Sequence, residues 1–283
     1  MTQELEKLKD WIGSRETDVD TVTVPAVHRL AATLDLDYPM PKPGDPLPVG
    51  WHFILFPRVA RHSQLGADGH PRRGDFLPPV PLPRRMFAGR RIRFVADLRV
   101  GDEVRRESVI QEVSVKQGRT GTMVFVTVQT DISGPRGLAV AEEQDIVYRE
   151  AAAPGAVPPA PQPAPGRAVW SRTVTPDPVM LFRYSALTFN GHRIHYDHPY
   201  VTRTEGYPDL VMNGGLTTLL VLELARTRAS TPITHLSSRN VRALFVNQPI
   251  TLAGEPSADN RTAKLWALDQ DGALALSAEA EFR

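Results

Sequence analysis

The stretch GLTTLLVLELARTRAS, residues 215–230, decides the fold that the sequence predicts. Its apolar residues surround the helix axis instead of forming one stripe. They are Leu216, Leu219, Leu220, Val221, Leu222 and Leu224. A helix that is apolar on nearly every side must be enclosed by other structure, and a sheet wrapped around one central helix meets this requirement. The alternative is a helix in a two-layer α/β domain, which is disfavoured because the neighbouring strand-like segments follow one another without intervening helices.

The segment 91–150 predicts an antiparallel meander. β-Branched and aromatic residues alternate there with polar ones, and the turn sequences VGD, KQGRTG and SGPRG interrupt the pattern. The segment 240–283 has the same texture. The two stretches also align in order, since GLAVAEEQDIVYR resembles GALALSAEAEFR. We infer a diverged duplication of one strand-rich module.

The run AAAPGAVPPAPQPAPG, residues 151–166, predicts an extended linker, because its prolines disfavour both a helix and a paired strand. The chain of 283 residues is long for one ordinary domain. We therefore expect an N-terminal module, 1–150, and a C-terminal module, 167–283. A short helix is expected at 25–36, where Pro25 suits a first turn.

The composition argues against several functional classes. With 33 basic and 32 acidic residues the formal net charge is +1, so the chain lacks the basic field on which nonspecific nucleic-acid binding relies. It has no cysteine, which excludes disulfides and thiolate chemistry. The sequence shows neither a signal-peptide core nor an apolar run of about 18 residues that could span a bilayer. We expect a cytoplasmic protein with no nucleic-acid or membrane partner.

The richest polar segment, RYSALTFNGHRIHYDHPYVTRTEGYPDLVMNGGL, covers residues 183–216 and leads into the apolar helix. It contains three histidines, His192, His195 and His198, and an imidazole can accept and donate protons near neutral pH. The first N–H groups of the following helix are unpaired and lie at its positive end, so they can stabilise a negatively charged oxygen. The segment therefore predicts a site for proton transfer.

This segment also resembles a known family. The run FNGHRIHYD, followed by EGYP and a glycine-containing helix start, is similar to the hydratase segment of MaoC-like and hot-dog 3-hydroxyacyl-thioester dehydratases. The upstream run DGHPRRGDFLPPVPLPRRMFAG resembles the fused double hot-dog subgroup that includes mesaconyl-CoA and itaconyl-CoA hydratases. The resemblance implies an α+β double hot-dog fold, in which two fused modules place antiparallel sheets around a central helix. It implies that only the C-terminal module carries the catalytic motif.

The resemblance assigns roles to individual residues. The family's segment is usually D-x-N-P-x-H, and His195 matches its histidine as a general base. Asn190 stands where the aspartate would be, so the usual carboxylate partner is missing, and Asp197 is an alternative partner. Gly214 occupies the family's oxyanion-donor position. Asn190 could instead only turn the backbone, and Gly214 could only begin the helix.

Three further residues are expected to contact the substrate: Tyr184, Gly215 and Arg242. The basic run PRRMFAGRRIRF, residues 83–94, is expected to form a solvated face of a strand, although the resemblance favours contacts between some of its arginines and coenzyme A phosphates. No metal is expected, because Gly191 and Pro199 disfavour a regular helix that would align the three histidines. Substitutions at first-module histidines, namely His52, His62 and His70, are expected to leave the chemical step intact.

The implied function is the reversible hydration of a 2-enoyl-CoA to a 3-hydroxyacyl-CoA, including branched or dicarboxylic substrates such as mesaconyl-CoA or itaconyl-CoA. No cofactor is expected, because coenzyme A is part of the substrate. Two alternatives stay open: a dehydratase acting on acyl-carrier-protein thioesters, and a non-catalytic acyl-thioester-binding protein, which the missing aspartate suggests. A homodimer of double hot-dogs is a further alternative to a monomer.

Overall fold

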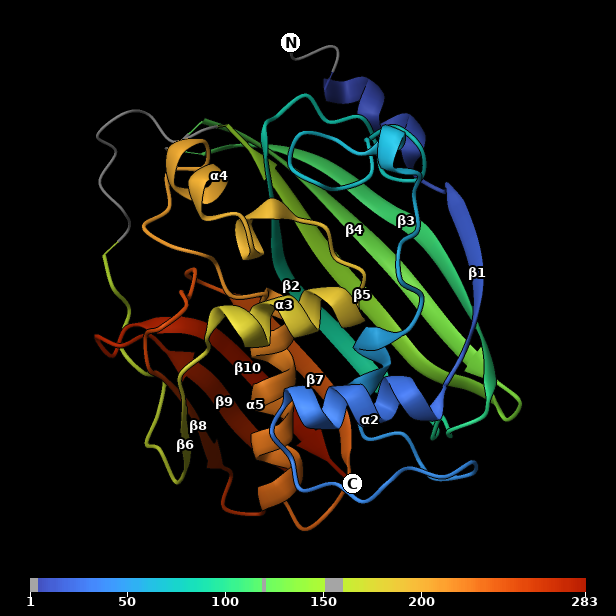
Figure 1. Ribbon diagram of the computed structural model, residues 1–283, viewed down its shortest axis with the longest axis vertical. Coiled ribbons are helices and arrows are strands. Elements are labelled where there is room, and N and C mark those ends of the chain that lie inside the picture. The colour runs from blue at the N-terminus through green and yellow to red at the C-terminus, as the bar shows by residue number, and fades with distance from the viewer. Residues whose placement is uncertain (1–4, 119–120, 151–159) are drawn as a thin grey trace.

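A single antiparallel sheet organises the molecule. The computed structural model describes residues 5–118, 121–150 and 160–283, so the first part of the expected linker, 151–159, lies outside the described residues. Its remainder, 160–166, has no regular secondary structure and is largely exposed. The sheet has 10 strands in the order β1-β3-β4-β5-β2-β7-β10-β9-β8-β6 (Figure 1).

The strands of the N-terminal half are β1 (Arg15–Thr21), β2 (Arg84–Phe94), β3 (Glu103–Gly118), β4 (Gly121–Gly134) and β5 (Gly137–Arg149). Those of the C-terminal half are β6 (Trp170–Val174), β7 (Ile233–Asn240), β8 (Ile250–Pro256), β9 (Thr262–Leu268) and β10 (Leu274–Phe282). The α-helices are α2 (Val24–Thr33), α3 (Pro178–Leu187), α4 (His198–Arg203) and α5 (Gly214–Arg228). The short 3-10 helices are η1 (Lys7–Trp11), η2 (Trp51–Ile54), η3 (His62–Gln64) and η4 (Arg193–His195).

The strand order repeats in the two halves. Numbered by chain order within its own half, each half has its strands in the order first, third, fourth, fifth and second from the outer edge to the centre. The two second strands, β2 and β7, pair with each other. In this arrangement β5 corresponds to β10, and these are the strands whose sequences align. The repeated topology agrees with the inferred duplication.

A glycine permits the close approach of the two halves. Gly89 in β2 pairs with Arg239 in β7, next to an irregularity in the β2–β5 register. A Cβ atom on Gly89 would stand 2.3 Å from the carbonyl oxygen of Ser238, so a larger residue would force the strands apart. The halves therefore share one continuous sheet.

The apolar helix predicted at 215–230 is α5, and it is enclosed as expected. All its residues from Leu216 to Ala225 are buried, and the helix contacts strands β6 to β10 of its own half. Figure 1 shows α5 in front of these strands, with α3 and α2, which contact each other, passing across it nearer the viewer. The helix predicted at 25–36 is α2, and Thr23 caps it by accepting from Ala26 N.

One buried carboxylate joins the N-terminal half to α5. Glu223, whose side chain is 1% exposed, accepts a hydrogen bond of 2.7 Å from Trp51 Nε1 and pairs with Arg226 at 2.7 Å. A buried charge is tolerated only where such partners satisfy it. The contact fixes η2 against the central helix, and thereby fixes the start of the loop that follows η2. No helix in the described residues is long and apolar enough to cross a bilayer.

Candidate active site

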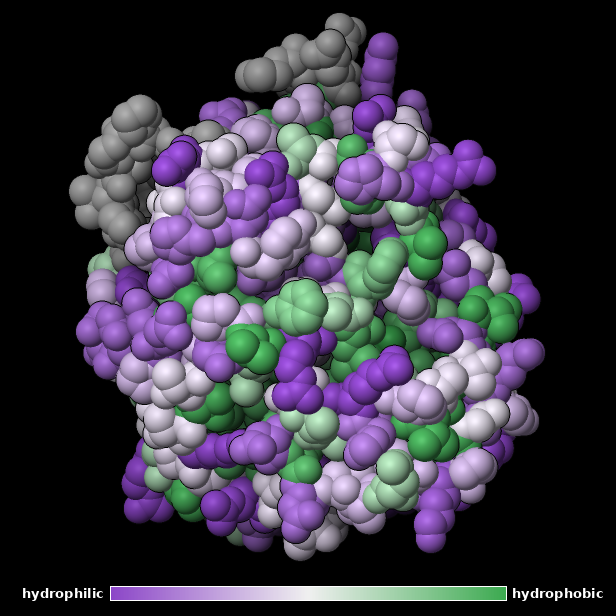
Figure 2. Space-filling view, viewed as in Figure 1, coloured by the Kyte–Doolittle hydropathy of each residue, from purple (hydrophilic) through white to green (hydrophobic). Residues whose placement is uncertain are grey.

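A cavity of about 1020 Å³ lies between the two halves of the chain. Its walls come from the loop after η2, from β2, from α3 and the segment after it, and from the start of α5. Apolar side chains gather near the centre of the face drawn in Figure 2, where the surface is hollowed. Phe182 and Phe189 line the cavity and are more than half exposed. The size and the mixed lining are typical of a small-molecule site.

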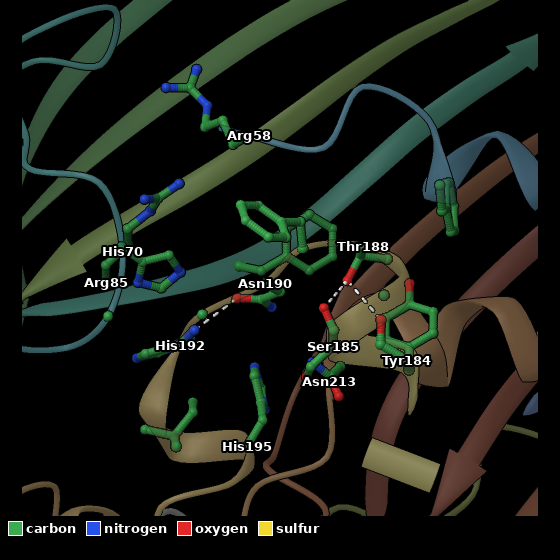
Figure 3. Close-up of a pocket in the computed structure, with 18 of the residues that line it drawn as sticks. Arg58, His70, Arg85, Tyr184, Ser185, Thr188, Asn190, His192, His195 and Asn213 are labelled. Carbon is green, nitrogen blue, oxygen red and sulfur yellow. Dashed lines mark hydrogen bonds between the residues drawn. The ribbon is translucent and has the colours of Figure 1, made fainter. Parts of the chain in front are cut away.

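The segment after α3 is shaped by local hydrogen bonds. Thr188 Oγ1 donates to the Tyr184 carbonyl at 2.8 Å, and Phe189 then takes a left-handed conformation with φ +51°. Asn190 Oδ1 accepts a hydrogen bond of 3.0 Å from the backbone N–H of His192, so the alternative that Asn190 turns the backbone is realised (Figure 3). Asn190 also lines the cavity, and its amide group remains a donor there.

His195 has the geometry of a general base. The imidazole is buried, and its Nδ1 lies 2.7 Å from the carbonyl oxygen of Val211. Because a carbonyl only accepts, Nδ1 carries the hydrogen, which leaves Nε2 as the basic nitrogen. Burial lowers the pKa of His195 to about 4, although the hydrogen bond to Val211 opposes the shift. The ring is therefore neutral at neutral pH.

Two more histidines continue from His195 in a row. The ring centroids of His195 and His192 are 5.4 Å apart, and those of His192 and His70 are 4.2 Å apart. Burial, together with the neighbouring charges of His70 and His195, lowers the pKa of His192 to about 2. His70 comes from the N-terminal half. His70 lines the cavity together with His195, as do His52 and His62, so the expectation that substitutions at these first-module histidines leave the chemical step intact stays a prediction.

Asp68 supports His70 from behind. Its Oδ2 lies 3.1 Å from Nδ1 of His70, and its Oδ1 accepts the backbone N–H of His70 at 3.1 Å. Burial acts to raise the pKa of Asp68, but the hydrogen bonds and charge of His70 hold it well below its usual range. The pair consists of an ionised carboxylate and an imidazole that faces the cavity. In the sequence motif, Asn190 stands in place of the family's aspartate, so the motif itself contains no such carboxylate.

A close backbone contact holds this pair in place. Gly69 has φ +88°, and a Cβ atom on it would stand 1.9 Å from the carbonyl oxygen of Gly191. The backbone N–H of Arg193 donates to the Asp68 carbonyl at 2.9 Å, which closes the same contact. Two loops that lie far apart in sequence thus pack backbone against backbone.

We expect Gly69→Ala to lower kcat roughly 100-fold, because displacement of reacting groups by about 1 Å has an effect of that size. The added methyl group would push the loop that carries Asp68 and His70 away from Gly191. Gly74→Ala is the matched control, because Gly74 also has positive φ. A Cβ atom on Gly74 would stand 3.5 Å from Cβ of Pro79, which is an ordinary van der Waals contact. Equal turnover in the two variants, measured with each one folded, would contradict the proposed contact.

The start of α5 offers hydrogen-bond donors to a ligand. Asn213, the residue before the helix, makes no side-chain cap, so the first N–H groups at Gly214 and Gly215 are available to a bound group. The Tyr184 hydroxyl lies 2.8 Å from where a Cβ on Gly215 would stand. Burial raises the pKa of Tyr184 to about 12, so the hydroxyl stays protonated as a donor. Tyr184 therefore lies against Gly215, and Gly214, Gly215 and Tyr184 all line the cavity.

The other expected site residues have partners of their own. Asp197 accepts from Arg193 at 2.8 Å and caps α4 by accepting from Tyr200 N, and it is not among the residues that line the cavity. This placement argues against Asp197 as the partner of His195. Arg242 lines the cavity and pairs with Asp269 at 3.2 Å.

Three side chains at the cavity have a donor set that a metal could use. One ligand atom from each of Asp68, His70 and His192 lies within 4.8 Å of the others. However, Asp68 and His70 already bind each other, so a metal would have to replace that hydrogen bond. The expectation of a metal-free site stays a prediction.

The sequence and fold are similar to those of known proteins. The family model for hydroxyacyl-thioester dehydratase type 2 matches residues 50–246. Mesaconyl-C(4)-CoA hydratase of Chloroflexus aurantiacus is 48% identical over 274 residues, which cover 96% of this chain and 96% of that protein. A solved MaoC-like dehydratase has a TM-score of 0.73 at 15% identity, with 98% of this chain and 99% of that chain covered.

A second solved structure bears on the fold. A Mycobacterium tuberculosis protein described as having a double hotdog fold has a TM-score of 0.57 at 14% identity, and the match covers 98% of this chain and 97% of that chain. Together with the repeated strand order and the enclosed helix, these similarities confirm the predicted α+β double hot-dog.

Proposed function

Because the chain belongs to the hydroxyacyl-thioester dehydratase type 2 family, we propose that it is a hydro-lyase that adds water reversibly to a 2-enoyl-CoA. The observation that carries the proposal is the buried, neutral imidazole of His195, held beside the free start of α5. The Chloroflexus relative is named for the C4 thioester of mesaconate, and we propose that branched dicarboxylic thioester as the substrate. We place the reaction in the cytoplasm.

The start of α5 binds the thioester carbonyl in this proposal. When water adds to the β-carbon of the double bond, the electrons of that bond move toward the carbonyl oxygen, which becomes enolate-like. The backbone N–H groups at Gly214 and Gly215 and the hydroxyl of Tyr184 donate to this oxygen, and donors aimed at a developing charge stabilise the transition state. The positive end of α5 adds to this effect.

His195 acts as the base toward water. Its Nε2 takes a proton as the water oxygen bonds to the β-carbon, while Val211 fixes the ring through Nδ1. Asn190 cannot exchange protons in this pH range, so its amide group orients the water or the thioester. Asn190 is thus a positioning residue rather than a replacement for the aspartate of the wider family.

His70 returns a proton to the α-carbon. Asp68 holds the His70 ring through Nδ1 and stabilises positive charge on it, and the opposite ring nitrogen faces the cavity. One turnover of hydration then protonates His195 and deprotonates His70, and exchange with solvent restores both. Dehydration follows the same steps in reverse. The pair Asp68–His70 supplies the carboxylate-supported group that the segment itself lacks.

The test of the function is loss of the conjugated absorbance of enoyl-CoA thioesters in the presence of the full chain. We expect turnover with the C4 thioester of mesaconate, and formation of the corresponding 3-hydroxy thioester. A parallel reaction with the same acyl group on acyl-carrier protein tests the carrier. Saturable binding of all thioesters without turnover would instead identify a non-catalytic acyl-binding protein.

A further inference from the structure

Arg85 differs from the other arginines that line the cavity. Arg58 donates to both carboxylate oxygens of Glu16 at 2.8 Å, and Arg73 donates to three backbone carbonyls at 2.6, 2.7 and 3.1 Å. The other pairs are Arg72 with the Leu65 carbonyl, Arg90 with Glu142, Arg106 with Asp18 and Arg242 with Asp269. Within residues 5–118, 121–150 and 160–283, no hydrogen bond or ion pair engages the Arg85 guanidinium.

The surroundings of Arg85 are unfavourable for a lone cation. Burial lowers the pKa of Arg85, and the positive charges of Arg58 and Arg73 act in the same direction. The carboxylate of Asp68 favours the charge on Arg85 but is already bound to His70. A desolvated guanidinium without an internal partner is costly to keep, so a partner from outside the chain is expected.

Arg85 lies on the strand that also reaches the start of α5. Arg85 and Phe87 are two residues apart in β2, so their side chains leave the same face of the sheet roughly 7 Å apart. The Phe87 ring lies 3.5 Å from where a Cβ on Gly214 would stand. Figure 3 shows Arg85 with His70 on one side of the pocket, and His195 on the other. An anion bound by Arg85 would therefore lie a short acyl chain away from the proposed carbonyl site.

We infer that Arg85 binds the free carboxylate of a short dicarboxylic acyl chain, and so selects dicarboxylic over monocarboxylic thioesters. The inference rests on the proposed function, because it places the thioester carbonyl at the start of α5. The planar guanidinium donates two parallel N–H bonds to a carboxylate, a geometry that an ammonium group does not reproduce. A methyl group in the same position would leave the partly buried cation unpaired, and this penalty is the source of selectivity.

The test measures binding of two saturated thioesters that differ only at the distal end of the acyl chain, succinyl-CoA and butyryl-CoA. We expect the wild-type protein to bind succinyl-CoA more tightly, and Arg85→Gln to lower the ratio of the two affinities roughly 100-fold or more. Arg85→Lys, which keeps the charge but not the planar fork, should restore only part of the ratio. Calorimetry or competition with a fluorescent thioester gives both dissociation constants.

Arg72→Gln is the matched control, because Arg72 also lines the cavity but is exposed, and the substitution removes the same charge. Its affinity ratio should stay close to that of the wild-type protein. Contacts to coenzyme A cancel in the ratio, since both thioesters carry it. If Arg85→Gln weakens the two thioesters equally, Arg85 holds the common part or the fold, and the inference is wrong.

Failure of the function and failure of this inference give different results. Binding of saturated thioesters needs no turnover, so an Arg85-dependent ratio in a protein that hydrates no enoyl-CoA would reject only the proposed reaction. Turnover of enoyl-CoA by a protein with no preference for succinyl-CoA would reject only the carboxylate site. If the wild-type protein binds neither succinyl-CoA nor butyryl-CoA, the carboxylate site is also rejected.

Discussion

His195→Ala should lower kcat at least roughly 100-fold while the protein stays folded, which is the scale of losing a positioned general base. The variant loses Nε2 of His195, the neutral ring nitrogen that the hydrogen bond of Nδ1 to Val211 leaves free to accept a proton. His198→Ala is the matched control, because His198 is 59% exposed and lies at the start of α4. The rate of loss of enoyl-CoA absorbance measures both variants, and near-normal turnover of a folded His195→Ala protein would remove His195 from the mechanism.

The pH profile gives the same prediction a second readout. His195 works as a base only when neutral, so kcat/KM falls as the pH drops through its pKa. Burial moves that pKa from 6.5 to about 4, and the acidic limb should therefore lie well below the pH at which an ordinary histidine titrates. His195→Ala should abolish this limb in its residual activity. An unchanged limb would mean that another group accepts the proton from water.

The fold was predictable because its strongest signals are local. The run of apolar residues from Leu216 to Leu224 requires enclosure whatever the rest of the chain does. Alternation and turn residues predicted the strands β3, β4 and β5, since their periodicity is read within a few residues. Glu223 is the exception in α5, because its partner Trp51 lies far away in sequence.

Half of the site was not predictable, because it depends on contacts between distant loops. His195, Tyr184 and Gly214 lie in one continuous segment, and the structure places all three at the cavity. The placement of His70 in the cavity was not predicted, because it depends on the backbone contact between Gly69 and Gly191, which no periodicity encodes. One signal was present: the run from 57 to 83 is a long, proline-rich stretch with little regular structure, and such loops in compact domains are often functional.

Asp68→Asn should lower kcat by about 10-fold or more, because Asp68 orients the His70 ring. His70→Ala should lower kcat roughly 100-fold, because His70 donates the proton. Asp197→Asn is the matched control, because it makes the same change from a carboxylate to an amide. Asp197 is the alternative partner of His195 in the sequence motif, but it pairs with Arg193 outside the cavity. It should leave kcat within a few-fold of wild type. Single-turnover measurement of hydration separates these effects from thioester binding.

The double variant decides whether Asp68 and His70 act as one unit. If Asp68 works only through the hydrogen bond of 3.1 Å to His70, removing it from a protein that already lacks the imidazole should cost almost nothing further. Asp68→Asn with His70→Ala should then match His70→Ala alone. Additive losses would mean that Asp68 also holds the loop against Gly191, and that its effect is structural. Full activity in Asp68→Asn, together with loss of activity in Asp197→Asn, would return the missing carboxylate to Asp197.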